Sequence, residues 1–135
     1  MNTLKATAKR ENNGTIIIES LDSLFSGKGK SIKEAREEMI LCMMDFKKLA
    51  IKKNMKYPPF LDDEFVIEIL FDVKSFLEFY NGIISLAALE SISGIHQKQL
   101  WNYLHTDTKP RKKQIERLMS AIADFSQELS VVRIK

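Results

Sequence analysis

Cysteine, proline, glycine and long apolar runs are all scarce in this chain of 135 residues. Its one cysteine, Cys42, cannot form an internal disulfide, which excludes the disulfide-stapled class of small secreted domains. No apolar run approaches the ~20 residues that span a bilayer, and residues 1–13 contain no apolar signal segment. We therefore expect a protein of the reducing cytoplasm with no membrane partner, in which Cys42 is a small core residue.

Residues typical of catalytic and metal sites are also few. The two histidines, His96 and His105, both lie in the last third of the chain. Several acids of the first half lie at scattered positions, without a spacing typical of a two-metal nuclease site: Glu11, Glu19, Asp22, Glu68 and Asp72. We therefore predict that the protein is not an enzyme and needs no metal or other cofactor.

The first half of the chain has the pattern of a small sheet. Residues 4–9 alternate roughly between apolar and polar types, and a β-branched run begins at Thr15, just after Asn12-Asn13-Gly14. Two such runs around an Asn-Gly turn predict a hairpin. A weaker third strand is expected over residues 24–30. The apolar run over residues 65–71 predicts a fourth strand, too apolar to form an open edge of the sheet without cover.

Between the third and fourth strands the sequence predicts a long helix. Ser31 and Glu34 have the spacing of a capping box, so the helix should begin there. Tyr57-Pro58-Pro59 lies beyond its end, since proline cannot continue a helix. Apolar residues recur every three or four positions and predict a stripe that faces the sheet: Ile32, Ala35, Met39, Cys42, Met43, Phe46, Leu49 and Ala50.

The second half has the pattern of helices only. Residues 72–80 place apolar side chains on one helical face, and Leu86, Leu89 and Ile92 form a stripe on the next helix. Gly94 then ends that helix, and another begins at about His96.

A long final helix is expected after Pro110, a residue suited to a helix start. We therefore predict an α+β fold with two domains. Residues 1–72 would form a β-β-β-α-β sheet with one long helix, and residues 73–135 an all-α bundle of about four helices.

The helix that follows Gly94 carries polar side chains on its outer face. Leu100, Tyr103 and Leu104 are spaced to pack inward, and Trp101 is expected to contact the final helix. Glutamine and asparagine can pair bidentately with adenine, and lysine can donate to guanine, so this face suits the major groove of DNA. The candidate base-reading residues are His96, Gln97, Lys98, Gln99 and Asn102. A plain helical hairpin with a solvated face is the alternative.

A cationic segment follows this helix. Residues 96–117 hold six lysines and arginines against two acids, whereas residues 1–72 hold twelve of each sign. Positive charge beside a helix that enters the major groove could contact phosphates and set the register of that helix. The candidate phosphate contacts are Lys109, Arg111, Lys112 and Lys113.

The order of these parts resembles the helix-turn-helix of the Cro and phage-repressor class. The turn glycine, the next aliphatic residue, the buried aliphatic residue five positions later and the proline before the next helix recur in that class, and here they match Gly94, Ile95, Leu100 and Pro110. Where the class usually has a small residue at the helix crossing, this chain has Glu90. Either the carboxylate leaves along the helix edge, or the two helices cross more loosely than usual.

The first half is similar to the N-terminal domain of HicB-type antitoxins. The predicted hairpin, the loop over residues 21–29 and the run Gly29-Lys30-Ser31-Ile32-Lys33-Glu34-Ala35 carry the resemblance. The family's usual proline- and glycine-containing loop is absent, with residues 21–24 in its place. The resemblance implies a partial RNase H-like fold that covers an RNA-cleaving toxin, and many members join this domain to a C-terminal DNA-binding module.

Together the two resemblances imply an antitoxin of a HicA/HicB-type pair. Its partners would be a HicA-like toxin protein, a double-stranded DNA operator and a second copy in a homodimer or higher oligomer. A stand-alone regulator with a sensing or dimerising first domain remains open, as does a protein-interaction module that has lost DNA binding. Residues 131–134 alternate like a strand that could join a sheet of its own chain or of another subunit.

Overall fold

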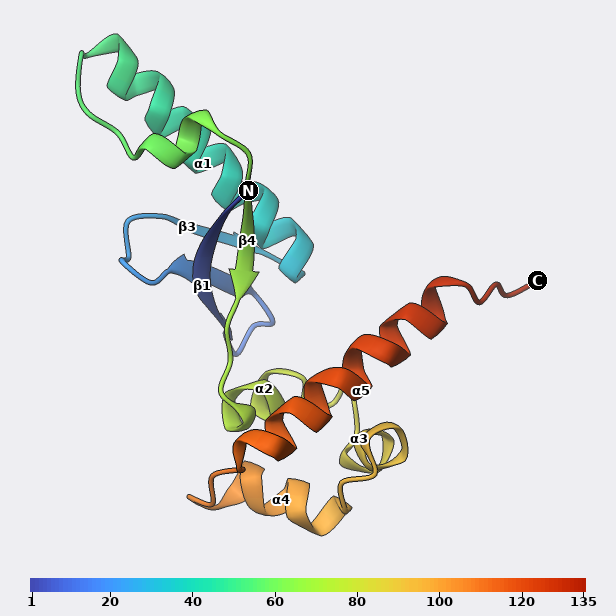
Figure 1. Cartoon of the computed structure of the whole chain (residues 1–135). Helices are drawn as coiled ribbons and strands as arrows, with labels where there is room; N and C mark the ends of the chain where they lie inside the picture. Colours follow the sequence, from blue (N-terminus) through green and yellow to red (C-terminus); the bar gives the residue numbers. More distant parts are fainter. The chain divides into compact units, whose positions relative to one another are not determined.

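The computed structural model describes all residues, 1–135, and divides them into two compact units, residues 1–71 and 72–135. The fold class is α+β, as predicted, with four strands in one mixed sheet and five α-helices (Figure 1). No helix is both long enough and apolar enough to cross a membrane.

The first unit is a four-stranded sheet with strand order β3-β2-β1-β4. Strands β1 (Asn2–Arg10), β2 (Ile16–Ser20) and β3 (Ser26–Gly29) are antiparallel neighbours, and β4 (Phe65–Ile69) pairs in parallel with β1. The turn between β1 and β2 includes Gly14, whose φ of +88° favours glycine. The predicted hairpin is therefore confirmed.

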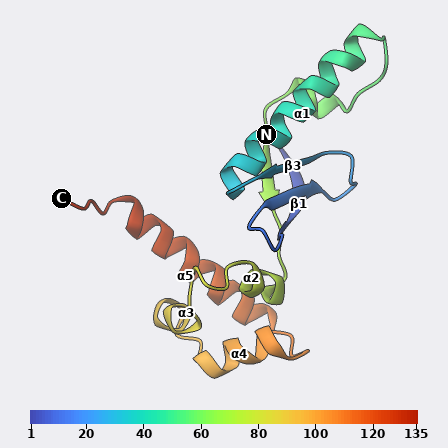
Figure 2. The same ribbon diagram turned by 180° about the vertical axis from the view of Figure 1, so that it is seen from behind.

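Helix α1 (Ile32–Lys52) lies on one face of this sheet (Figures 1 and 2). It begins as the capping pattern predicts, because the Ser31 hydroxyl accepts a hydrogen bond from the Glu34 N–H at 3.1 Å, and the Glu34 carboxylate accepts one from the Lys30 N–H at 2.8 Å. The helix approaches β3 so closely that a Cβ at Gly27 would overlap the backbone of α1. Its buried residues are Ala35, Met39, Met43 and Ala50.

The predicted core stripe of α1 is too wide. Cys42 is exposed rather than a core residue, and Phe46 and Leu49 are 41% and 51% exposed. The buried line of α1 is narrower than the predicted stripe: Ala35, Met39 and Met43 lie four residues apart, and Cys42 and Phe46 lie beside that line. Phe46 keeps one aromatic contact, an edge-to-face packing on Phe25 at 5.5 Å between ring centroids.

Strand β4 forms an edge of the sheet, and it has the cover that its apolar composition predicted. Ile67 is buried on the packed face, and the Phe65 ring packs edge to face on Phe60 of the 3₁₀ helix η1 (Pro59–Asp62). Val66 on the opposite face stays 41% exposed. Cover on one face is therefore enough to keep this strand in the sheet.

The second unit consists of four helices: α2 (Val73–Phe79), α3 (Leu86–Ser93), α4 (Gln97–His105) and α5 (Lys112–Ser130). Helix α3 packs on both α4 and α5, and α2 packs on α4. The residues buried in the shared core are Leu77, Leu89, Ile95, Leu100, Tyr103 and Leu118. Of the two pairings suggested for residues 131–134, the one within the chain is absent, since these residues pair with no strand of the sheet.

Candidate nucleic-acid interface

The turn between α3 and α4 is held by a buried serine and a glycine. Ser85 caps the start of α3, where its hydroxyl accepts from the Ala88 N–H at 3.0 Å. Gly94 caps the end of α3 with a left-handed φ of +73°. The buried Ser93 hydroxyl donates to the Leu89 carbonyl oxygen and accepts from the Ile95 N–H. These two bonds satisfy the buried Ser93 hydroxyl and hold the backbone between α3 and α4 in one conformation.

Arg117 of α5 fixes the same turn from outside. Its Nε donates to the Ser93 carbonyl oxygen at 2.8 Å, across 24 residues of sequence. A Cβ at Gly94 would lie 2.6 Å from the Arg117 guanidinium and would displace the end of that side chain, while the left-handed φ favours glycine. Sequence reasoning missed this role of Arg117, because no local pattern indicates so distant a contact.

Helix α4 begins with two side-chain hydrogen bonds at its first turn. His96 lies at the N-cap, where its Nδ1 accepts from the Lys98 N–H at 3.1 Å. The Glu90 carboxylate, on α3, accepts from the Gln97 N–H at 2.8 Å. Of the two alternatives for Glu90, the structure therefore favours the first: the carboxylate reaches along the helix edge and joins α3 to the start of α4. A carboxylate at a helix N-terminus is also favoured by the helix dipole.

The outer face of α4 carries the exposed candidates and an aromatic pair. Gln99 and Asn102, both predicted to read bases, are half-buried at the margins of this face. The face itself consists of His96, Gln97, Lys98, Trp101 and His105.

Trp101 lies outside the core of the unit. Trp101 is 48% exposed, and its ring stacks on that of His105, with 4.3 Å between centroids and 19° between planes. Gln97, Trp101 and His105 are spaced by four residues and so lie along one helical line. That spacing is visible in the sequence and could have revealed this arrangement.

The start of α5 has no side-chain cap. Arg111 occupies the N-cap position, and the first turn contains no acid. All four predicted phosphate contacts are exposed: Lys109, Arg111, Lys112 and Lys113. Unbonded N–H groups of a first turn, surrounded by cations, form an environment that attracts anions.

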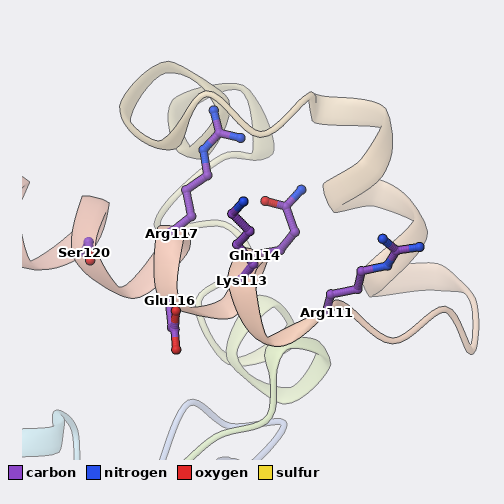
Figure 3. Close-up of a pocket in the computed structure, with 6 residues that line it drawn as sticks. All are labelled: Arg111, Lys113, Gln114, Glu116, Arg117 and Ser120. Carbon is purple, nitrogen blue, oxygen red and sulfur yellow. The ribbon is translucent and has the colours of Figure 1, made fainter.

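Two of these cations share a shallow surface with Arg117. An open depression of about 600 Å³ is lined by Arg111, Lys113, Gln114, Glu116, Arg117 and Ser120 (Figure 3). In that view Arg117 reaches toward the turn between α3 and α4, whereas the Glu116 carboxylate points the opposite way. Lys112 lies outside the depression, 3.9 Å from the Glu116 carboxylate.

Lys109 lies near the start of α2 instead. The Asp72 carboxylate caps that helix by accepting from the Ser75 N–H at 2.7 Å, and this bond lowers the pKa of Asp72. The Ser75 hydroxyl lowers this pKa further, and the charges of Lys109 and Lys74 add smaller contributions. Lys109 is thus partly engaged with an acid of its own unit.

The second unit therefore combines the exposed face of α4, whose first turn is held by hydrogen bonds, with the exposed lysines and arginines around the start of α5. No group of three or more histidine, cysteine or acidic side chains is arranged to hold a metal ion. No protein-family model, curated protein or solved structure matches the chain.

Proposed function

We propose that this chain is an antitoxin of the HicA/HicB type that represses its own operon. In this proposal the first unit is a β-β-β-α-β domain that covers an RNA-cleaving toxin. The second unit is a helix-turn-helix bundle in which α4 enters the major groove of operator DNA. The protein itself would perform no catalysis and need no cofactor.

One observation carries the DNA-binding part of the proposal: α4 presents Gln97 and Lys98 from a first turn that Glu90 and His96 hold in place. A bidentate base contact depends on donor and acceptor positions fixed to within a fraction of an ångström, which a loosely held helix start does not offer. The bond from Arg117 to the preceding turn adds to this rigidity.

Each side chain of the interface has a distinct role in the proposal. Gln97 and Lys98 read bases, while His96, Gln99 and Asn102 contribute at the margins. Trp101 lies on the same exposed face of α4 as Gln97 and Lys98 and offers an apolar surface to a thymine methyl group. Lys109, Arg111, Lys112 and Lys113 hold phosphate, which supplies affinity without sequence preference.

The antitoxin part rests on the resemblance of the first unit. The exposed apolar residues of α1 support it, because a protein partner that covered these side chains would remove them from water. Leu41, Phe46 and Leu49 are 64%, 41% and 51% exposed on this helix. A toxin partner would remove this surface from water.

Two measurements test the proposal. We expect the purified chain to bind duplex DNA from the region upstream of its own gene more tightly than a scrambled duplex of equal length, by fluorescence anisotropy at several salt concentrations. Equal affinity for both duplexes at every salt concentration would exclude the repressor role. Co-expression with the neighbouring reading frame should yield a stable complex with a small basic protein. Operator binding without such a partner would instead favour a stand-alone regulator.

A further inference from the structure

The C-terminal half of α5 extends beyond the other helices of its unit (Figures 1 and 2). Leu118 is the last buried residue of this helix and Ile122 the last half-buried one, and every residue from Ala123 to Lys135 is exposed. This extension nevertheless carries large apolar side chains. Phe125 is 40% exposed and Leu129 is 52% exposed.

These exposed residues continue the stripe that packs inside the unit. Leu118 and Ile122 face the core of the bundle, and Phe125 and Leu129 follow at steps of three and four residues. Val132 comes three residues later, just past the end of α5 at Ser130. Alternating steps of three and four keep a stripe on one side of a helix, in the way that two helices packed along each other require. The unit's own core covers only the first part of this stripe.

We propose that a second copy of the chain covers the rest, with the two α5 extensions packed antiparallel about a two-fold axis. The charges of the segment support this partner and this direction. Asp124 and Glu128 precede Leu129 and its neighbours, and Arg133 and Lys135 follow them.

In an antiparallel pair, Phe125 on α5 of one copy would lie beside Val132, which follows α5 of the other copy. The same alignment brings Asp124 close to Arg133 of that following segment. Symmetry makes each of these contacts twice, with Leu129 near its own symmetry mate. A parallel pair would align acid with acid. In the single chain the Arg133 guanidinium donates to the carbonyl oxygens of Ser130 and Val132, at 2.9 Å each, and it is exposed.

This inference deepens the proposed function and rests on it in one respect. A helix-turn-helix protein that reads a palindromic operator needs two recognition helices related by a two-fold axis. The α5 extension lies in the same unit as α4, so pairing through α5 would supply that axis. Self-association itself can be measured without DNA, so failure of the pairing and failure of operator binding are separate results.

The test compares two double variants of the full chain by sedimentation equilibrium in the absence of DNA. Phe125→Glu with Leu129→Glu charges the stripe, whereas Ala123→Glu with Gln127→Glu adds the same charges to the opposite side of the helix. We expect the wild type and the second variant to be dimers. The first should dissociate at least about 100-fold more readily, with an unchanged circular dichroism spectrum. A wild type that stays monomeric at tens of micromolar would overturn the pairing, whatever covers its apolar stripe. Equal dimerisation of the two variants would overturn it as well.

Charge reversal tests the direction of the pair. Asp124→Arg should weaken the dimer because it faces Arg133 of the other copy, and adding Arg133→Asp to the same chain should restore it. Lack of restoration in the double variant would overturn the antiparallel arrangement.

Discussion

Helices α4 and α5 begin in opposite ways, although both starts belong to the same unit. At α4, two backbone N–H groups are bonded by Glu90 and His96. At α5, no side chain caps the first turn, and Arg111 stands at the cap position. Side-chain bonds that hold a helix start suit hydrogen bonding to particular base edges. Free N–H groups among exposed cations suit phosphate, because a phosphate contact carries no sequence information.

The contrast predicts that substitutions at the two starts change DNA binding in different ways. Gln97→Ala should reduce the preference for operator over scrambled DNA by about 1–3 kcal/mol, because it removes a base contact. Arg111→Ala should weaken binding to both duplexes alike and lower the slope of log K against log salt by about 0.9 for the lost phosphate contact. Anisotropy titrations across a salt series measure both quantities. If both variants change the sequence preference and the salt dependence alike, the two helix starts do not differ in how they contact DNA.

Gly94→Ala should disturb the start of α4 while leaving that of α5 in place. The left-handed φ costs a residue with a Cβ about 1–2 kcal/mol, and displacing the Arg117 guanidinium adds the loss of its bond to the Ser93 carbonyl oxygen. Gly82→Ala is the matched control, since Gly82 has a φ of +87° and open space around its missing side chain. Thermal unfolding should show a larger loss for Gly94→Ala. Equal losses of thermal stability would mean that the contact with Arg117 adds nothing to the cost at Gly94.

Glu90→Ala should lower the free energy of unfolding by about 1 kcal/mol, because the Gln97 N–H loses its acceptor. Glu90→Gln retains a side-chain oxygen at the same reach, so it should lose less stability. Chemical denaturation of the two variants separates the hydrogen bond from the charge. If both variants match the wild type, Glu90 is only a solvated residue and α4 is held by His96 alone.

A third helix start in the same unit, that of α2, adds a pH-dependent comparison. Because the pKa of Asp72 lies below its ordinary value of 3.8 in the folded chain, its contribution is complete above that value and is lost as the pH falls through the lowered pKa. We expect Asp72→Asn to cost a few tenths of a kcal/mol at pH 6, since the carboxylate is largely solvated. The gap from the wild type should narrow as the pH falls below 3.8 and through the lowered pKa. A gap of constant size across that range would contradict the cap.

Local patterns in the sequence predicted the parts that depend on nearby residues. The hairpin at Gly14, the cap at Ser31 and the helix end at Gly94 were all identified, because each depends on the φ or hydrogen bonding of adjacent residues. Gln97 and Lys98 are exposed, as predicted for the outer face of this helix.

Features that depend on distant residues were missed. Hydrophobic periodicity predicted a broad stripe of core residues on α1. Which of them are buried depends on how the helix packs on the sheet, and that packing leaves Phe46 and Leu49 exposed. The edge position of β4 depends on pairing with β1, across more than fifty residues. Likewise the roles of Glu90 and Arg117 arise only when α3, α4 and α5 meet.

The most direct test of DNA recognition by α4 uses the protein's own fluorescence. Trp101 is the single tryptophan of the chain, and it lies half-exposed on the outer face of α4. Quenching by acrylamide is measured for the free protein and for the protein saturated with duplex DNA from its upstream region. Our account predicts that bound DNA shields Trp101, so that the quenching constant falls. A quenching constant that is unchanged, while anisotropy shows the DNA to be bound, would place DNA on another surface and contradict the account.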